Sequence, residues 1–197
     1  MAPRDATRDD WMAWQHETRT EAARTAQLLE PHDAALAAQV AAYAASAPEE
    51  PPAGSLGLLT RIHGDYHLGQ LLDTDRGWVI LDFEGEPARP LAERITLNHP
   101  LIDVAGMLRS WDYAAHTAGR DNPAREAWLG AVSQAFRDAY WREAGAASTR
   151  FLPGPAARDA LLRHFILRKA LYELRYELGS RPDWLSIPAA AVRSMLE

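Results

Sequence analysis

The sequence predicts a mainly helical protein of the α+β class, and three observations lead to that prediction. Five long segments repeat apolar residues at helical spacing. Only one short stretch, residues 71–81, is typical of paired strands. The chain has 197 residues, 47% of them hydrophobic, which suffices for one domain with its own core. We therefore expect a single domain over 1–197, with helices in 1–57, functional loops in 58–100 and helices again in 101–197.

Taken in order, the helical segments are residues 8–29, 33–46, 101–116, 124–144 and 156–178. Thr7 or Asp9 is suited to cap the first helix, because both side chains accept hydrogen bonds from exposed backbone N–H groups. Trp11 and Trp14 lie on one stripe of that helix, which indicates core packing. Pro31 then interrupts the helical pattern.

The later segments are delimited in the same way. Arg181 and Pro182 end the long helix before them, and a short terminal helix is expected after Pro188. Residues 47–57 and 88–100 lack a clean period and are interpreted as loops. The 124–144 helix is indicated by the helical spacing of Trp128, Val132, Phe136 and Tyr140.

The strand-like stretch predicts a β-hairpin, in which Leu71–Asp73 pairs with Trp78–Leu81 through a turn at 74–77. A short strand at Leu58–Ile62 is expected to lead into it. Folding the hairpin about Arg76 places Gln70 opposite Asp82, near a second carboxylate at Asp65. Oxygen ligands of this kind suit Mg²⁺, which completes its coordination with phosphates and water.

Composition excludes several other classes. The net charge of −6 implies no broad basic surface for nucleic acid. No apolar run is long enough to span a membrane, and the N-terminus is too polar for a signal peptide. The sequence has no cysteine, so disulfides and thiolate metal sites are excluded. These features are typical of a cytoplasmic protein.

Four motifs together carry a resemblance to a known family. They are HGDYHLGQ at 63–70, DFEGEPARPLAER at 82–94, DVAGMLRSWDYAA at 103–115 and KALYELRYELGSRPDWLSIP at 169–188. The set resembles the aminoglycoside-phosphotransferase-like kinases, and within them the maltokinases. The resemblance implies the C-terminal lobe of a protein-kinase-like fold, a helical bundle with a small hairpin that bears the catalytic and metal loops.

The resemblance assigns roles to individual residues. It makes Asp65 the catalytic base, which orients the attacking hydroxyl, and Gln70 and Asp82 ligands of the Mg²⁺ that accompanies ATP. Glu84 is a further candidate for the metal. A structural role in fixing the loops fits three other side chains better than catalysis does: His63, His67 and Asp103.

The substrate implied by the resemblance is maltose, with glucosamine or another sugar or amino sugar as the alternative. Sugars are recognised by ring stacking and by carboxylates, and the 156–178 helix offers both. Its substrate candidates are Tyr172, Tyr176 and Glu177, with Arg175 and Trp184 nearby. The competing interpretation is a solvated helix face with Lys169 paired to Glu173.

Two other functional classes remain open at this stage. His63, Asp65 and His67 could belong to a metal-dependent hydrolase, although their spacing matches no established zinc motif. The second class is a non-catalytic lobe that binds sugar or a protein without transferring phosphate. The sequence has one lysine, Lys169, on a late helix, and no β-rich N-terminal lobe is found. We therefore expect weak ATP binding and slow turnover by this chain alone, with that lobe supplied in cis or in trans.

Overall fold

The computed structural model describes residues 2–46, 50–85, 91–117, 123–147 and 151–197. Contacts within the chain define two compact units, each of two segments. The first contains Met1–Ala6 and Gly54–Leu162, and the second contains Thr7–Ala53 and Arg163–Glu197. Each unit is described by itself, and a single domain over 1–197 stays a prediction. In the described part of the chain, no helix is both long and apolar enough to cross a membrane.

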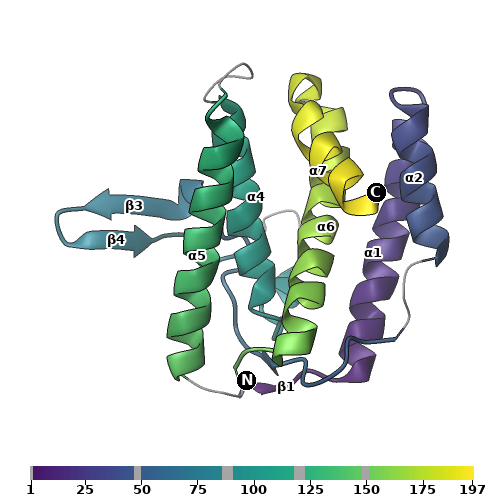
Figure 1. Cartoon of the computed structure of the whole chain (residues 1–197). Coiled ribbons are helices and arrows are strands. Elements are labelled where there is room, and N and C mark those ends of the chain that lie inside the picture. The colour runs from purple at the N-terminus through teal and green to yellow at the C-terminus, as the bar shows by residue number, and fades with distance from the viewer. Residues whose placement is uncertain (1, 47–49, 86–90, 118–122, 148–150) are drawn as a thin grey trace. The chain divides into compact units, whose positions relative to one another are not determined.

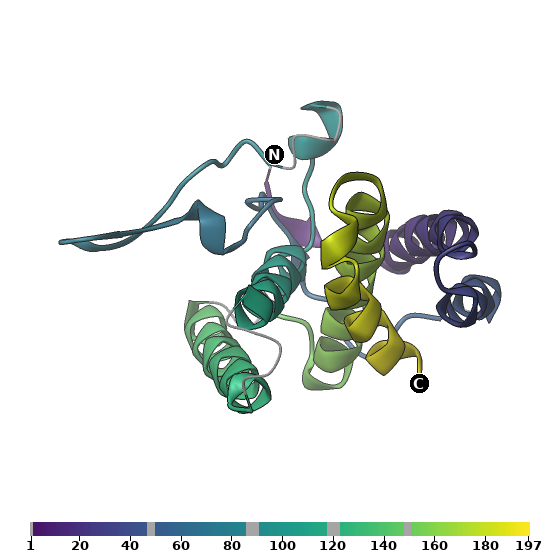
Figure 2. The same ribbon diagram turned by 90° about the horizontal axis from the view of Figure 1, so that it is seen from above.

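The first unit is built on two long helices, α4 (Leu101–Thr117) and α5 (Arg125–Ala147), which lie side by side (Figures 1 and 2). The predicted helices at 101–116 and 124–144 are thereby confirmed. Helix α4 contributes a broad buried apolar stripe to the core of this unit. That stripe includes Leu101, Val104, Ala105, Met107 and Leu108.

Helix α5 is only partly covered along its apolar face. Trp128 keeps 45% of its surface exposed, and none of the described α5 side chains is fully buried. The Trp128 ring meets Trp111 of α4 edge-on, with centroids 5.9 Å apart. Apolar spacing correctly predicted the helix, and the structure adds how little of its face is covered. A helix covered along one stripe keeps its flanking side chains half-exposed.

Two small antiparallel sheets complete the first unit. Strands β1 (Arg4–Asp5) and β2 (Leu58–Leu59) form one. Strands β3 (Leu71–Thr74) and β4 (Gly77–Ile80) form the predicted hairpin. The hairpin extends away from α4 and α5 (Figure 1). Both of its faces are accessible, and Trp78 is 69% exposed.

Two local predictions in this unit need correction. The strand expected at Leu58–Ile62 is only two residues long, with an isolated bridge from Thr60 to Asn98. Within the segment 88–100, expected to be irregular, a short helix α3 (Leu91–Arg94) forms. Residues 88–90 of that segment lie outside the described residues.

The second unit contains α1 (Arg8–Leu29), α2 (Ala34–Ser46), most of α6 (Pro155–Ser180) and α7 (Ser186–Leu196). Thr7 caps α1, accepting from the backbone N–H of Asp10, whose carboxylate accepts from the Thr7 N–H in return.

The core of the second unit joins all four helices. As predicted, Trp11 and Trp14 are buried. The Trp14 ring packs edge-on against Phe165 of α6, at a centroid distance of 5.1 Å. Further along the helices, the core contains Leu29, Leu36, Val40, Leu167, Leu171, Leu174 and Val192.

The chain end also departs from the prediction. A single 3₁₀ turn η2 (Pro182–Trp184) follows α6, and α7 starts at Ser186, two residues before Pro188. Proline lacks a backbone N–H, but the first turn of a helix has no intrahelical partners for its N–H groups. Pro188 is therefore accommodated inside the helix rather than before it.

Candidate functional site

The hairpin brings Gln70 and Asp82 together, although its register is shifted by one residue from the prediction. Leu71 pairs with Ile80, and the backbone N–H of Leu81 donates to the Gln70 carbonyl over 2.9 Å. The shift arises because only Asp75 and Arg76 separate the two strands. Asp82 follows one residue later, and its carboxylate is still 3.4 Å from the Gln70 amide nitrogen.

Asp82 occupies an unusual backbone conformation. Its φ of 57° makes it the non-glycine residue with positive φ in the described part of the chain. Left-handed geometry costs about 1 kcal/mol or more for most residues, with aspartate and asparagine among the more tolerant. Its side chain is exposed. Such local strain is typical of functional sites, where it presents a side chain in a fixed direction.

The loop that contains Asp65 and the loop that contains Asp82 are in direct backbone contact. Gly64 and Gly85 both have positive φ, and a Cβ added to Gly64 would lie 3.4 Å from the Cα of Gly85. The His63 ring links the same loops. Its Nε2 donates to the Leu81 carbonyl over 2.7 Å, and its Nδ1 accepts from the Asp65 N–H over 3.3 Å. These partners define the tautomer, because a carbonyl only accepts and an amide N–H only donates.

Asp103, in the first turn of α4, binds the backbone of the loop that contains Asp65. Its two carboxylate oxygens accept from the backbone N–H groups of His63 and Gly64, over 2.7 and 2.8 Å. Burial raises the pKa of Asp103, while these two N–H donors oppose the shift. Asp103 thus fixes the loop backbone, the structural role expected for it.

Two further contacts on α4 were missed by the sequence analysis. A Cβ on Gly106 would lie 2.6 Å from the Tyr66 carbonyl oxygen, so only glycine lets the loop approach the helix this closely. One turn later, the Ser110 hydroxyl accepts from the Leu68 N–H over 2.9 Å. A glycine inside an apolar helical pattern was the available signal for this close approach.

Asp65 itself lies beside His67, with Oδ2 and Nε2 3.8 Å apart and 18% of the Asp65 side chain exposed. The other ring nitrogen of His67 accepts from the Gly69 N–H over 3.0 Å, which caps the 3₁₀ turn η1 (Leu68–Gln70). His67 therefore directs the N–H of its remaining nitrogen toward Asp65.

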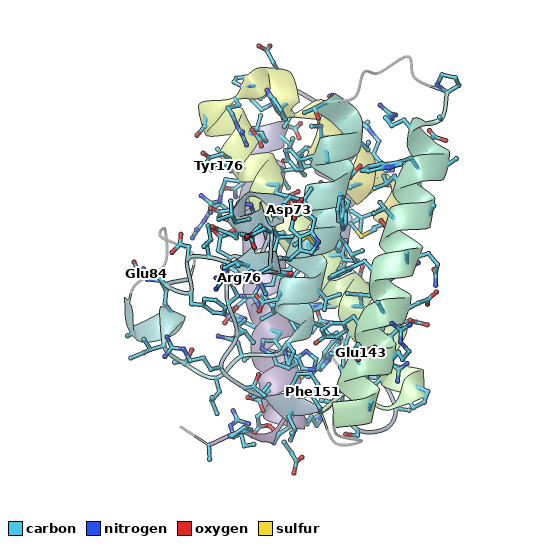
Figure 3. All side chains as sticks on the ribbon, turned by 90° about the vertical axis from the view of Figure 1, so that its left-hand side faces the viewer. Asp73, Arg76, Glu84, Glu143, Phe151 and Tyr176 are labelled. Atoms are coloured by element: carbon cyan, nitrogen blue, oxygen red, sulfur yellow. The ribbon has the colours of Figure 1, made fainter. Side chains whose placement is uncertain are left out.

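Glu84, the third metal candidate, contacts the protein through its backbone. Its carbonyl oxygen accepts from Arg94 of α3 over 3.4 Å, and its side chain is exposed. Figure 3 views the hairpin from its tip, with Asp73 and Arg76 labelled and Glu84 to one side. Among the described residues, no three His, Cys, Asp or Glu side chains are grouped to hold a metal. With both His63 nitrogens engaged, the hydrolase interpretation gains no support.

The sugar candidates lie on α6, in the second unit. The Tyr172 and Tyr176 rings are stacked, with centroids 6.4 Å apart and planes 20° from parallel. Tyr176 is 46% exposed, whereas Glu177 is only 1% exposed and binds Arg181. Glu173 is also buried. The competing interpretation of this stripe as a solvated helix face is therefore wrong.

Comparison with known proteins identifies the class. The phosphotransferase enzyme family, APH, matches residues 2–161, so the chain belongs to this family. The predicted kinase-like superfamily is confirmed.

Two of the relatives found are glucosamine kinases. One from Mycolicibacterium smegmatis is 31% identical over 153 residues, covering 73% of this chain and 37% of the relative. One from Streptacidiphilus jiangxiensis is 28% identical over 143 residues, covering 70% and 32%. The match spans about a third of the length of each of these proteins. The finer prediction of a maltokinase is not confirmed.

The solved structures agree. A glucosamine kinase structure matches 99% of this chain at a TM-score of 0.81 and 26% identity, and the match covers 47% of that protein. A second, of a glucosamine kinase in complex with glucosamine, ADP and inorganic phosphate, has the same TM-score at 25% identity, with 49% of its length covered.

Proposed function

We propose that this chain carries the catalytic and metal-binding loops of an ATP-dependent kinase that phosphorylates an amino sugar. The observation that carries the proposal is the contact between two loops at Gly64 and Gly85. Asp65 follows Gly64 on one loop, and Asp82, whose carboxylate is 3.4 Å from the Gln70 amide nitrogen, precedes Gly85 on the other. Phosphoryl transfer requires a hydroxyl-orienting group next to a metal site.

Asp65 is proposed to accept the proton of the attacking sugar hydroxyl. A bond forms between that hydroxyl oxygen and the γ-phosphorus, the bond from phosphorus to the bridging oxygen breaks, and ADP leaves. His67 lies beside this carboxylate, with its Nε2 3.8 Å from Asp65 Oδ2. His63 and Asp103 fix the loop backbone and take no part in the chemistry.

The residues present fit a magnesium ion. Asp82 offers an exposed carboxylate and Gln70 an amide oxygen, both hard oxygen donors, 3.4 Å apart at their nearest polar atoms. The amide would present its oxygen after rotation of the terminal group. Bound Mg²⁺ supplies charge neutralisation for the phosphates. Glu84 remains a proposed additional ligand from the same loop.

An amino sugar is favoured over maltose as the acceptor. Both named relatives are glucosamine kinases, and one solved relative was obtained with glucosamine and ADP. The acidic chain, with a net charge of −6, also attracts an ammonium group. The proposed acceptor face is on α6, at Tyr172, Tyr176 and Glu177. Maltose is the second candidate, on the resemblance of the motif around these residues.

The test is transfer of labelled γ-phosphate from ATP to glucosamine or to maltose, with Mg²⁺ present, over long incubations that detect slow turnover. We expect label on glucosamine in preference to maltose, and its loss in the Asp65→Asn variant. Asp75→Asn, an exposed aspartate in the hairpin turn, is the matched control. Label that appears equally with the wild-type protein and Asp65→Asn would contradict the proposed role of Asp65.

A further inference from the structure

The C-terminal end of α6 contains an arginine enclosed by two aromatic rings. Arg181 follows the last residue of the helix, and its N–H donates to the Glu177 carbonyl over 2.9 Å. The guanidinium carbon lies 5.3 Å from the centre of the Tyr176 ring and 5.2 Å from that of Trp184. Cation–π attraction operates within about 6 Å, so both rings are oriented by the same group.

The guanidinium is itself anchored by a buried carboxylate. Its Nε and Nη2 donate to the two oxygens of Glu177 over 2.9 and 2.6 Å, a parallel two-bond arrangement. Glu177 is 1% exposed, whereas 47% of the Arg181 side chain remains accessible. A carboxylate buried to this degree is strongly destabilising without its partner. Glu177 thus holds Arg181, and Arg181 in turn holds the rings.

Arg175, six residues earlier, provides a comparison. It also lies over a tyrosine ring, Tyr172, at 5.4 Å, and pairs with a glutamate, Glu21, through a single bond of 2.6 Å. Glu21 belongs to α1 and is 19% exposed. Arg175 therefore contacts one ring and uses one hydrogen bond, whereas Arg181 contacts two rings and uses two.

We infer that Arg181 is a positioning residue for the acceptor sugar: its guanidinium, fixed by Glu177, holds the Tyr176 and Trp184 rings in the orientation that receives a pyranose ring. The inference rests on the proposed function, because it takes the end of α6 as the acceptor site. This refines the proposed role of Glu177: because both of its oxygens bind the guanidinium, it contributes to the acceptor face through Arg181. Fixing the rings before the sugar arrives lowers the entropy lost on binding.

The experiment measures glucosamine binding by calorimetry to the 197-residue chain and its variants. Arg181→Ala is expected to weaken binding by about tenfold or more, because the rings lose their common support. Arg181→Lys keeps the charge and not the two-bond arrangement, so it should weaken binding to an intermediate degree. Arg142→Ala, which removes an exposed arginine of α5 outside the proposed acceptor face, is the control and should bind within about twofold of the wild-type protein.

Chemical rescue separates positioning from general destabilisation. Guanidinium chloride, far below denaturing concentrations, should restore sugar affinity to Arg181→Ala by refilling the space between the rings and Glu177. Ammonium chloride at the same concentration should not. Equal affinities of folded Arg181→Ala and wild-type protein overturn the inference, and so does failure of guanidinium to restore binding to a folded variant. If Arg181→Ala does not fold, unchanged affinity in Arg181→Lys overturns it.

Phosphate transfer separates this inference from the proposed function. Transfer that requires Asp65 and is indifferent to Arg181 supports the kinase function and overturns the role of Arg181. Sugar binding that depends on Arg181 without any transfer supports the positioning role and counts against the kinase function.

Discussion

The two candidate regions of this protein are built in opposite ways. Around Asp65, a few side chains bind loop backbone: Asp103 accepts from two N–H groups and His63 donates to a carbonyl. At the end of α6, the helix satisfies its own backbone, and side chains hold side chains through Arg181. The first arrangement fixes where a loop runs, and the second fixes how rings are turned.

This difference determines which substitutions should disrupt each region. The loop around Asp65 depends on the few side chains that bind its backbone, since its N–H groups have no helical partners. At the end of α6 the helix bonds its own backbone, so a substitution of a ring or of Arg181 should mainly change side-chain orientation. The following substitutions test this contrast.

The largest effect is expected at Asp65. Asp65→Asn removes the proposed proton acceptor and should lower phosphate transfer by about 100- to 10,000-fold, the usual range for a general base. The loop is held by His63 and Asp103, so the thermal unfolding midpoint should stay near that of the wild-type protein. Initial rates of phosphate transfer, together with calorimetric unfolding, check this. A variant with full activity would show that the loop serves some other purpose.

Asp103→Ala should be the most destabilising change in the Asp65 loop. It leaves the N–H groups of His63 and Gly64 without their acceptor, at about 1–3 kcal/mol for each buried group. Urea unfolding monitored by tryptophan fluorescence measures the loss. Asp112→Ala, on the same helix, removes the ion-pair partner of Arg109. Its loss of stability measures a contact between side chains, for comparison with the loss of the Asp103 contacts to the backbone. Equal losses of unfolding free energy in the two variants would mean that the loop depends on Asp103 no more than the helix depends on Asp112.

Two buried histidines predict acid sensitivity in both units. Burial lowers the pKa of His99 to about 4 and that of His164 to about 3. Between pH 6.5 and those values the unfolded chain binds protons that the folded chain does not, so the free energy of unfolding falls as the pH falls. For His99 the loss reaches about 3 kcal/mol by pH 4.

The His99 geometry explains this and supplies a test. Its Nε2 donates to the Leu56 carbonyl over 2.8 Å, and its Nδ1 accepts from the Leu101 N–H over 3.1 Å. A proton on Nδ1 would face that N–H donor. His99→Gln should therefore reduce the fall in stability between pH 7 and pH 4.5, whereas His32→Gln, at an exposed site, should not. A pH dependence that is unchanged in His99→Gln would contradict the assignment.

The smallest effect distinguishes two helical glycines. Gly106→Ala forces a Cβ against the Tyr66 carbonyl at 2.6 Å and should destabilise by about 1–3 kcal/mol. Gly130→Ala in α5 meets no atom within 4 Å and should stabilise by about 0.5–1 kcal/mol, the usual helix preference for alanine. Thermal unfolding of both variants measures the difference. The same sign in both would mean that α4 does not depend on close approach of the loop.

The sequence predicted the helices well because each buries one stripe at a regular period. Trp11 and Trp14 show that period directly. The motifs around Asp65 and Asp82 are short continuous stretches of sequence, so they could be recognised without the structure. The hairpin register was missed by one residue, because the number of residues in the turn decides it and neighbouring registers have similar patterns.

The sequence could not show how much of each helix face is buried by neighbouring segments. The exposed Trp128 and the buried Glu177 both reverse simple expectation, because burial depends on which neighbour lies opposite. The roles of Gly106 and Arg181 follow from distances between segments, and no local pattern contains those distances.

The central claim, that Asp82 and Gln70 hold a divalent cation beside Asp65, is tested most directly with Mn²⁺ as a paramagnetic substitute for Mg²⁺. Electron paramagnetic resonance would count the ions bound per chain in the presence of ADP. We predict one Mn²⁺ bound by the wild-type protein and by Asp73→Asn, an exposed hairpin control, and none by Asp82→Asn. Asparagine tolerates the left-handed backbone at this position, so the loop should keep its shape. Unchanged Mn²⁺ binding by Asp82→Asn would contradict the account.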